Sequence, residues 1–207
     1  MTGNSALERV SQDLLDLSDF AYQRLRDRLE GLTDDEYLWE PAGNCWSVRP
    51  VGDGTYRADG PTNADRPTDT DGSTNADRPT DADRPTDGAD QTPLTTIAWR
   101  VSHIIDMLGA RRNATWIGVT PAGRLPRTGA PGTAEAAVER LGRAYRLFRA
   151  HVATVDAATL ADAMGAVAGP YAQSTRASFI LHELDELIHH GAEVGVLRDL
   201  YRATRPA

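Results

Sequence analysis

The sequence contains no lysine, so all 22 of its basic side chains are arginines. Cys45 is the only cysteine, which excludes a disulfide within the chain and is typical of proteins of the reducing cytoplasm. No apolar run approaches the ~18 residues that a membrane span requires, and the first residues lack the basic start and short apolar block of a signal peptide. These absences predict a cytoplasmic protein that does not enter a membrane.

Positive charge is also scarce. The formal net charge is −8 at pH 7, and no stripe of basic residues alternates with aromatic ones, which argues against a nucleic-acid-binding protein. Hydrophobic residues make up 40% of the chain and charged residues 25%, as in ordinary globular proteins. A chain of 207 residues is long enough for one domain with a sizeable core.

Residues 52–92 have a composition that cannot support a folded core. The octamer TNADRPTD occurs at 62–69 and again at 74–81, and a shortened copy, ADRPTD, follows at 82–87. The segment contains ten aspartates and four arginines, and Tyr56 is almost its only large side chain to bury. Such a segment cannot offset the entropy of ordering itself. We predict a disordered acidic insertion rather than a calcium-binding repeat, because the prolines interrupt the loop and no glutamate closes it.

Outside this insertion, apolar residues recur at helical spacing. Over residues 5–31 they follow one another in steps of three and four, which is the pattern of one face of a long helix. Gly31 is expected to end that helix. Thr33 and Glu36 form a capping box that starts a short helix. The apolar positions of the long helix are Leu7, Val10, Leu14, Leu17, Ala21, Leu25 and Leu29.

Three further long helices are predicted after the insertion. The second helix is expected over 93–118, because a threonine followed by proline is typical of a helix start. Thr133 is expected to cap a third helix that runs to about Val155, and Ser174 to cap a fourth. No segment alternates convincingly enough between apolar and polar residues to be a strand.

Four long helices predict an all-α protein whose fold is a four-helix bundle. Residues 1–51 and 93–207 would form this single domain, and residues 52–92 would loop out without disturbing it. Residues 30–50 and 119–132 would be long crossover connections between the helices.

The segment HELDELIHHGAEV concentrates carboxylates and histidines in a helix that otherwise has a buried apolar face. His182, Glu186 and His190 are four residues apart and therefore lie above one another on a helix. Asp185 and His189 form a neighbouring stripe. A carboxylate and an imidazole four residues apart on one helix can bind a single ion, as in the metal sites of helical bundles.

A third ligand would have to come from another helix. His103, in AWRVSHIIDML, is the only other histidine within a strongly apolar helix face. Together with Glu186 and His190 it would leave open positions on the metal for water or substrate. The competing interpretations are a hydrogen-bonded core histidine at 103 and a solvated polar face on the last helix. We favour the metal site, because burying Glu186 unpaired would cost several kcal/mol.

Two other catalytic classes fit the sequence poorly. HELDE begins like the zinc-protease motif HExxH, but position 186 is glutamate instead of histidine. The sequence has no G-x-S-x-G motif, and Cys45 lies beside Trp46 without an adjacent base. A zinc protease of that class and a serine or cysteine hydrolase are therefore disfavoured.

Four segments of the chain are distinctive: LTDDEYLWEP, CWSVRP, TTIAWRVSHIIDML and HELDELIHHGAEVGVLRDLY. Together they resemble the DinB/YfiT-like superfamily of helical-bundle metalloproteins. The resemblance implies metal ligands at His103, Glu186 and His190, with Glu193 at a trailing polar position. Many members have histidine at the position of Glu186, whereas the branch similar to mycothiol-dependent maleylpyruvate isomerase has glutamate. His189 is a rival of His190, although the four-residue step from Glu186 favours His190.

The same resemblance implies a divalent metal ion, zinc or nickel, and chemistry on small thiols. Several members are similar to S-transferases or isomerases that use mycothiol or bacillithiol in place of glutathione. A metal ion lowers the pKa of a coordinated thiol, so that the thiolate can attack an electrophilic carbon of a small-molecule substrate. Because members of the family often dimerise, the resemblance also makes a homodimer a candidate.

Three more residues are candidates for substrate chemistry. Asp106, one turn beyond the histidine of the second helix, is a candidate catalytic base or partner of a ligand, and equally a helix-surface acid. Arg100 and Arg198 can contact an anionic substrate, or they can form exposed ion pairs. Substrate selection would fall to the loops at 119–132 and 165–173.

The leading hypothesis is therefore a divalent-metal-dependent enzyme that uses a low-molecular-weight thiol, as an S-transferase or isomerase acting on a small electrophile. One alternative is a non-catalytic metal-binding or stress-related helical bundle, or a helical interaction module. Another is a metal-assisted hydrolase that uses a bound water in place of the thiol.

Overall fold

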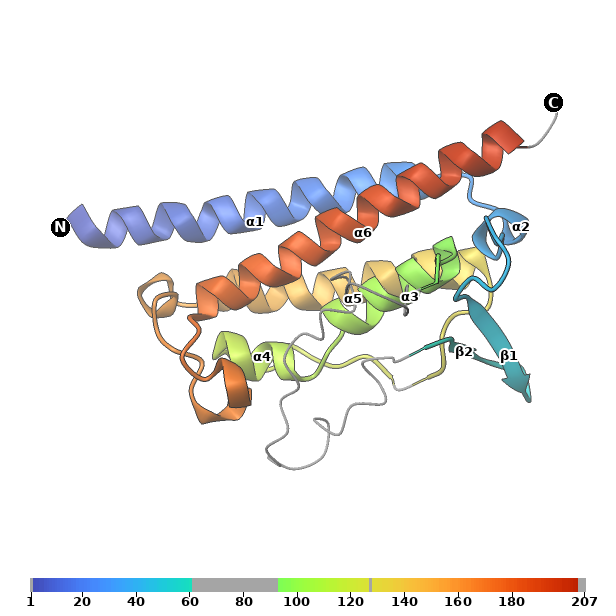
Figure 1. Ribbon diagram of the computed structural model, residues 1–207. Coiled ribbons are helices and arrows are strands. Elements are labelled where there is room, and N and C mark those ends of the chain that lie inside the picture. The colour runs from blue at the N-terminus through green and yellow to red at the C-terminus, as the bar shows by residue number, and fades with distance from the viewer. Residues whose placement is uncertain (1, 61–92, 127, 205–207) are drawn as a thin grey trace, which may run out of the picture.

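Four long helices form the body of the computed structural model, which describes residues 2–60, 93–126 and 128–204 (Figure 1). The helices α1 and α6 pack side by side and run in the same direction, while α3 and α5 run in the opposite direction. The predicted all-α four-helix bundle is confirmed. The bounds of these helices are Thr2–Leu29 for α1, Ile97–Leu108 for α3, Ala134–Thr154 for α5 and Arg176–Thr204 for α6.

Short elements connect the long helices. Two predicted caps are confirmed, because Thr33 Oγ1 accepts a hydrogen bond from the backbone N–H of Glu36 and Thr133 Oγ1 accepts one from that of Ala136, both at 3.3 Å. The other half of the predicted capping box is not formed, since the carboxylate of Glu36 accepts hydrogen bonds from Arg198. Gly31 follows the end of α1 with a φ of +68°, a left-handed conformation that suits glycine. The short elements are α2 (Asp34–Tyr37), α4 (Arg112–Ile117), the 3-10 helices η3 (Ala157–Thr159) and η4 (Ala166–Tyr171), and the strands β1 (Val48–Gly52) and β2 (Thr55–Ala58).

The strands β1 and β2 form an antiparallel hairpin that the sequence analysis did not predict. Asp53 and Gly54 connect them with positive φ values of 51° and 71°, as a tight two-residue hairpin turn requires. The expectation that the chain has no strand was therefore wrong, and so was the expected disorder of residues 52–60. The rest of the predicted insertion, residues 61–92, lies outside the described residues.

Tyr56 attaches this hairpin to the bundle. Its ring packs against the hydrophobic core, and its backbone oxygen accepts a hydrogen bond of 2.8 Å from the N–H of Ala130. A Cβ atom at Gly129 or Gly132 would collide with Tyr56, so only glycine allows this close approach. Residues 129–132 of the connection before α5 are thereby fixed against the hairpin.

Two helices start later than predicted. Thr96 Oγ1 caps α3 by accepting a hydrogen bond of 3.2 Å from the N–H of Trp99, four residues beyond the expected cap. Thr175 Oγ1 accepts a hydrogen bond of 3.1 Å from the N–H of Ser178 at the start of α6, so the cap is Thr175 instead of Ser174. Threonine and serine are both good caps, and spacing alone does not choose between neighbouring ones.

The single helix predicted over 93–118 is divided into α3 and α4. A Cβ atom at Gly109, where α3 ends, would lie 2.5 Å from Leu125 Cδ1, so the backbone is crowded there by the connection that follows. The side-chain amide of Asn113 donates hydrogen bonds of 3.0 and 3.1 Å to two carbonyl groups in the last turn of α3. These bonds satisfy carbonyl groups that would otherwise accept the next hydrogen bonds of a continuing helix.

The apolar stripe of α1 is buried only in part. Leu14, Leu25 and Leu29 belong to the core, whereas Val10 and Leu17 are exposed. Figure 1 shows the N-terminal end of α1 extending beyond α6, so the first turns have less protein to pack against. Within the described ranges, the helices include none that is long and apolar enough to cross a membrane.

Candidate metal centre

Three of the predicted ligands meet between α3 and α6. The Nε2 atom of His190 lies 3.0 Å from Glu186 Oε2, and the Nε2 atom of His103 lies 3.4 Å from the same oxygen. The two imidazole rings are almost perpendicular, at 84°, with their centroids 4.7 Å apart. A helix that supplies Glu186 and His190 at a four-residue step and a second helix that supplies His103 thus direct three ligand atoms to one point.

The spacing of these atoms fits a divalent ion. Zinc bonds of about 2.0–2.2 Å in tetrahedral geometry place neighbouring ligand atoms about 3.3 Å apart. The two separations from Glu186 Oε2 are close to that value, and the three ligand atoms all lie within 4.8 Å of one another. Two imidazoles and a carboxylate suit zinc, nickel and other first-row ions. That these residues bind a metal stays a prediction, which their geometry supports.

The site is closed on one side and accessible on the other. The side chain of His190 is 2% exposed, that of Glu186 is 19% exposed and that of His103 is 27% exposed. Solvent therefore reaches the cluster from the side of His103. A site with three protein ligands and one accessible side is typical of catalytic metal sites, whereas structural sites are closed by a fourth ligand.

The other nitrogen of His190 is held by a polar pair. Glu193 Oε2 lies 2.7 Å from His190 Nδ1, and Arg100 Nε lies 2.9 Å from the same carboxylate oxygen. A proton on Nδ1 would be donated to Glu193, which leaves the lone pair of Nε2 directed at Glu186 and the ligand point. Arg100 Nη1 also lies 3.1 Å from His190 Nδ1, so Arg100 is engaged inside the protein by these neighbours.

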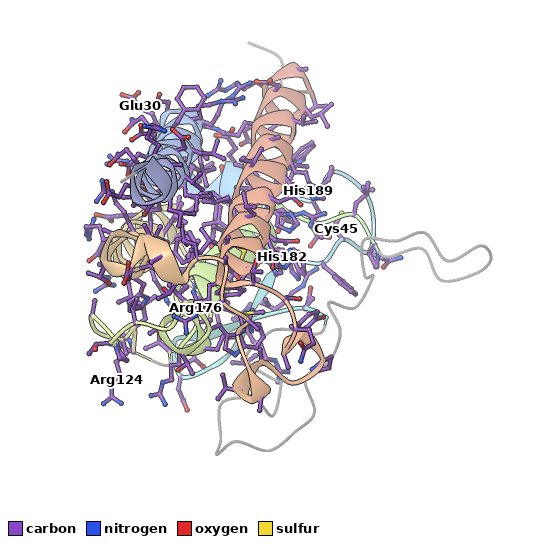
Figure 2. The ribbon with its side chains drawn as sticks, turned by 90° about the vertical axis from the view of Figure 1, so that its left-hand side faces the viewer. Glu30, Cys45, Arg124, Arg176, His182 and His189 are labelled. Carbon is purple, nitrogen blue, oxygen red and sulfur yellow. The ribbon has the colours of Figure 1, made fainter. Side chains whose placement is uncertain are left out.

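His189 and His182 lie elsewhere on α6. Both are exposed, and Figure 2 shows both labelled residues on one outer side of the helix. His189, with His190 and Glu193, belongs to a second group of ligand atoms close enough for an ion. We favour the first group, because Glu193 is already paired with Arg100 and the Nε2 atom of the exposed His189 lies 3.3 Å from the other oxygen of Glu193.

The members of the cluster shift one another's pKa. Hydrogen bonds from His103 and His190 hold the pKa of Glu186 well below its ordinary range. Burial opposes the charged form of His190, but its hydrogen bonds to Glu186 and Glu193 outweigh burial and raise its pKa. The carboxylate is therefore negative and attracts a positive partner, which can be a proton or a metal ion.

Glu183 is a buried carboxyl that the sequence analysis missed. Its side chain is fully buried one turn before Glu186, and within the described residues neither of its oxygens has a hydrogen-bond partner. Burial raises its pKa to about 7, although Arg112 Nη2 of α4 lies 3.7 Å from its Oε1 and opposes the shift. The available signal was spacing, because Glu183 stands three residues after Ile180 and four before Leu187, both of them buried.

Asp106 belongs to neither group of ligand atoms. It is half-buried on α3, and burial raises its pKa, while the charges of Arg140 on α5 and of His103 oppose that shift. Its predicted role as a catalytic base is neither supported nor contradicted by a contact, and it stays a prediction.

Arg198 does not face a substrate or solvent. It is buried, and its Nε and Nη2 atoms donate to the two carboxylate oxygens of Glu36 at 2.7 and 2.8 Å. The two interpretations of Arg198, as a substrate contact or an exposed ion pair, were both wrong. Sequence patterns alone did not reveal this pairing, because Glu36 comes from the distant α2.

Comparison with known proteins agrees with the geometry. A family model described as the DinB superfamily matches residues 18–194. The match contains His103, Glu186 and His190 and leaves out only the two ends of the chain. No curated protein and no solved structure matches the chain.

Proposed function

The chain belongs to the DinB superfamily, and from that premise we propose that it is a divalent-metal-dependent enzyme that uses a low-molecular-weight thiol. The reaction would be an S-transfer or an isomerisation of a small electrophile. The superfamily fold is compatible with a metal-binding enzyme. Zinc or nickel is the proposed metal, and mycothiol or a related thiol is the proposed cosubstrate.

One observation carries the proposal. Two imidazole nitrogens and a carboxylate oxygen converge from α3 and α6, and the side of the cluster at His103 is accessible. A purely structural cluster would gain nothing from leaving its ligands accessible. An accessible side is what a site needs in order to take up a ligand that is not part of the protein.

The residues have distinct roles in this proposal. A divalent ion, when bound, supplies Lewis acidity that lowers the pKa of a thiol, so that thiolate is available near neutral pH. Glu186 contributes one negative charge and the two neutral histidines none, so the site keeps a net charge of about +1, which attracts an anionic thiolate. Glu193 holds the proton on His190 Nδ1 and thereby keeps Nε2 free to act as a ligand.

Asp106 is our candidate for the proton acceptor. Burial moves its pKa upwards, and a base is most effective when its pKa lies near the working pH. Replacement of Asp106 by asparagine should lower kcat while the metal content stays at the wild-type level. An unchanged kcat would remove Asp106 from the mechanism.

A metal-assisted hydrolase is the second candidate. Two histidines and a glutamate are also the ligands of hydrolytic zinc enzymes, in which a bound water is the nucleophile. The donor set at His103, Glu186 and His190 is the observation that favours this alternative. A metal-binding bundle without turnover is the third outcome to be tested.

The test begins with protein purified without a histidine tag. Its metal content is measured, and turnover of an activated aryl halide and of an unsaturated carbonyl compound is followed with and without added mycothiol. We expect turnover that needs both metal and thiol, and formation of the thioether or of the isomerised product. Restoration of activity by zinc or nickel after chelation would identify the preferred ion.

The controls separate the three functions. Glu186→Gln should lose metal and activity together. Turnover that does not need thiol would replace the transferase by the hydrolase. Stoichiometric metal without turnover of any test compound would leave a metal-binding bundle.

A further inference from the structure

The two histidines of the metal centre are oriented by different means. His190 is held by the hydrogen bond that its Nδ1–H donates to Glu193, whose carboxylate oxygen also lies 2.9 Å from Arg100 Nε. His103 has no hydrogen-bond partner among the described residues other than Glu186. Its ring instead stacks on the indole of Trp99, with the two planes 5° apart and the centroids separated by 5.3 Å.

The indole of Trp99 is itself fixed to the hairpin. Trp99 Nε1 donates a hydrogen bond of 2.8 Å to the backbone oxygen of Asp59, which directly follows β2. Asp59 is held in turn, because its N–H donates to the oxygen of Ser47 at 2.8 Å and its Oδ2 accepts from the N–H of Ser47 at 2.9 Å and from Arg49 Nε at 3.0 Å. Rotation of the indole would break a bond to a rigid part of the backbone.

Two further groups pack around the same indole. The ring of Trp46 lies with its centroid 5.7 Å from that of Trp99 at an angle of 36°. The guanidinium carbon of Arg100 lies 5.1 Å from the Trp99 centroid. The indole is therefore confined by neighbours as well as by its hydrogen bond.

From these contacts we propose that Trp99 is a positioning residue of the metal centre, which holds the His103 ring in the orientation that directs Nε2 at the ligand point. The inference rests on the proposed metal site. An imidazole that binds a cation carries partial positive charge, and the negative face of an indole attracts it. A ring that is already oriented also loses less conformational entropy when the ion binds.

The hairpin then has a role in the site. Its end at Asp59 fixes Trp99, and Trp99 fixes His103, so a contact outside the bundle sets the direction of a ligand inside it. Partners that orient a metal-bound histidine typically change metal affinity by about 10–100-fold when they are removed. The effect of removing the indole should fall in that range.

The test compares three variants in the full chain. Trp99→Leu removes the ring, and Trp99→Phe keeps an aromatic face without the N–H donor. Trp116→Leu is the matched control, because Trp116 is also half-buried among aromatic rings but contacts Phe179 and Tyr171 instead of the cluster. The zinc dissociation constant is measured by competition with a chelator, and the visible absorption spectrum of the cobalt(II) form reports the ligand geometry.

We expect Trp99→Leu to bind zinc at least tenfold more weakly and to show a changed cobalt(II) spectrum. Trp99→Phe should have a zinc affinity between those of wild type and Trp99→Leu, because stacking is retained while the hydrogen bond to Asp59 is lost. Trp116→Leu should leave both readouts unchanged. If circular dichroism shows that Trp99→Leu does not fold, Trp99→Met replaces it, because the longer methionine side chain fills more of the space of the indole without a ring. We expect the same loss of zinc affinity and the same change of spectrum in that variant.

Wild-type affinity and spectrum in the folded leucine or methionine variant would overturn the proposal. An equal loss of zinc affinity in Trp116→Leu would overturn the proposal as well, because the loss would then follow from removing any half-buried tryptophan. Failure of the wild type to bind zinc or cobalt would overturn both this inference and the proposed function. Zinc binding that depends on Trp99, without any thiol-dependent turnover, would support this inference while contradicting the proposed function.

Discussion

The helix α6 carries two polar clusters, one almost completely buried and the other partly exposed. Towards its C-terminal end, Arg198 forms a two-bond ion pair with Glu36, and its Nη1 atom donates to the backbone oxygens of Arg28 and Glu30. Arg198 and Glu36 are almost completely buried. Every charge in this cluster has its partner within the protein.

The cluster around Glu186 is different, because its members are candidate metal ligands whose donor atoms converge on one point. Two imidazole nitrogens approach the same carboxylate oxygen, and His103 is open to solvent on one side. Arg100 is the nearby fixed cation, and it is paired with Glu193. This cluster can accept an ion from solution, whereas the one at Arg198 cannot.

The comparison separates a structural role from a functional one. A buried ion pair whose hydrogen bonds are complete connects α2, the end of α1 and α6, and its removal would leave an uncompensated charge. A convergent set of ligand atoms at an accessible place gives little stability and can bind a cofactor. Substitutions in the two clusters should therefore affect different measurements.

The largest effect is expected from Arg198→Ala. It should lower the free energy of unfolding by about 3–5 kcal/mol, because Glu36 is left buried without its partner. Urea denaturation followed by circular dichroism measures this change. Arg28→Ala is the control, since the Arg28–Asp199 pair is more than half exposed on both sides and should contribute less than about 1 kcal/mol. Equal losses of unfolding free energy in the two variants would show that the buried Arg198–Glu36 pair stabilises the fold no more than an exposed ion pair does.

Replacement of the ligands should act on metal binding instead. Glu186→Gln and His190→Ala should each weaken zinc binding by more than about 100-fold, beyond the range for residues that only orient a ligand. The secondary structure should be retained. His189→Ala is the matched control and should retain nearly all of the affinity, because His189 lies outside the favoured group. Full metal occupancy in either ligand variant would exclude that residue as a ligand.

Glu183→Gln should change how stability depends on pH. The pKa of Glu183 is raised from 4.5 to about 7 in the folded chain, so the unfolded chain loses this proton at lower pH than the folded one. In the wild type, the protonated Glu183 contributes to the free energy of unfolding fully below pH 4.5, and this contribution is lost as the pH rises through about 7. Glutamine does not titrate.

The stability of Glu183→Gln relative to wild type should therefore increase by about 2 kcal/mol between pH 5 and pH 8. Urea denaturation of both proteins at the two pH values measures the difference. Asp185→Asn, on the exposed side of the same helix turn, controls for a general loss of negative charge. A constant difference between the proteins would show that Glu183 is ionised at pH 5 in the folded chain.

The smallest effect is expected from Glu193→Gln. Glutamine can still accept the hydrogen bond from His190 Nδ1 but lacks the charge, so zinc affinity should fall by about tenfold. Competition with a chelator measures the loss, and the cobalt(II) spectrum should stay close to wild type. A loss as large as that of Glu186→Gln would make Glu193 a ligand and would favour the second group, with His189.

The site was easier to predict than some of its surroundings. The four-residue step between Glu186 and His190 is local, and any helix that includes both brings them together. The hairpin was missed because the acidic repeats made all of residues 52–92 look like one unfolded segment. The Asp53-Gly54 turn and the ring of Tyr56 were signals of a strand pair, but the aspartate-rich composition outweighed them.

Glu183 and Arg198 show the limit more clearly. Both are charged residues in a helix with many polar neighbours. The apolar residues around Glu183 indicate one face of the helix, but the sequence does not show which segment covers that face or which residue pairs with Arg198. Burial of Glu183 depends on α4, and the partner of Arg198 comes from α2. These are contacts between elements distant in the chain.

The amino-acid sequence by itself determined the four long helices, their helical period and the spacing of Glu186 and His190, because these depend on neighbours within a few turns. The sequence named His103 as the candidate third ligand, and packing of α3 against α6 brought it to Glu186. Only the tertiary structure decided that Trp99, held by the hairpin, stacks on His103 and that Arg198 pairs with Glu36. The physical reason is that a helix fixes distances along itself, whereas the partner of each face is chosen by packing between segments far apart in the chain.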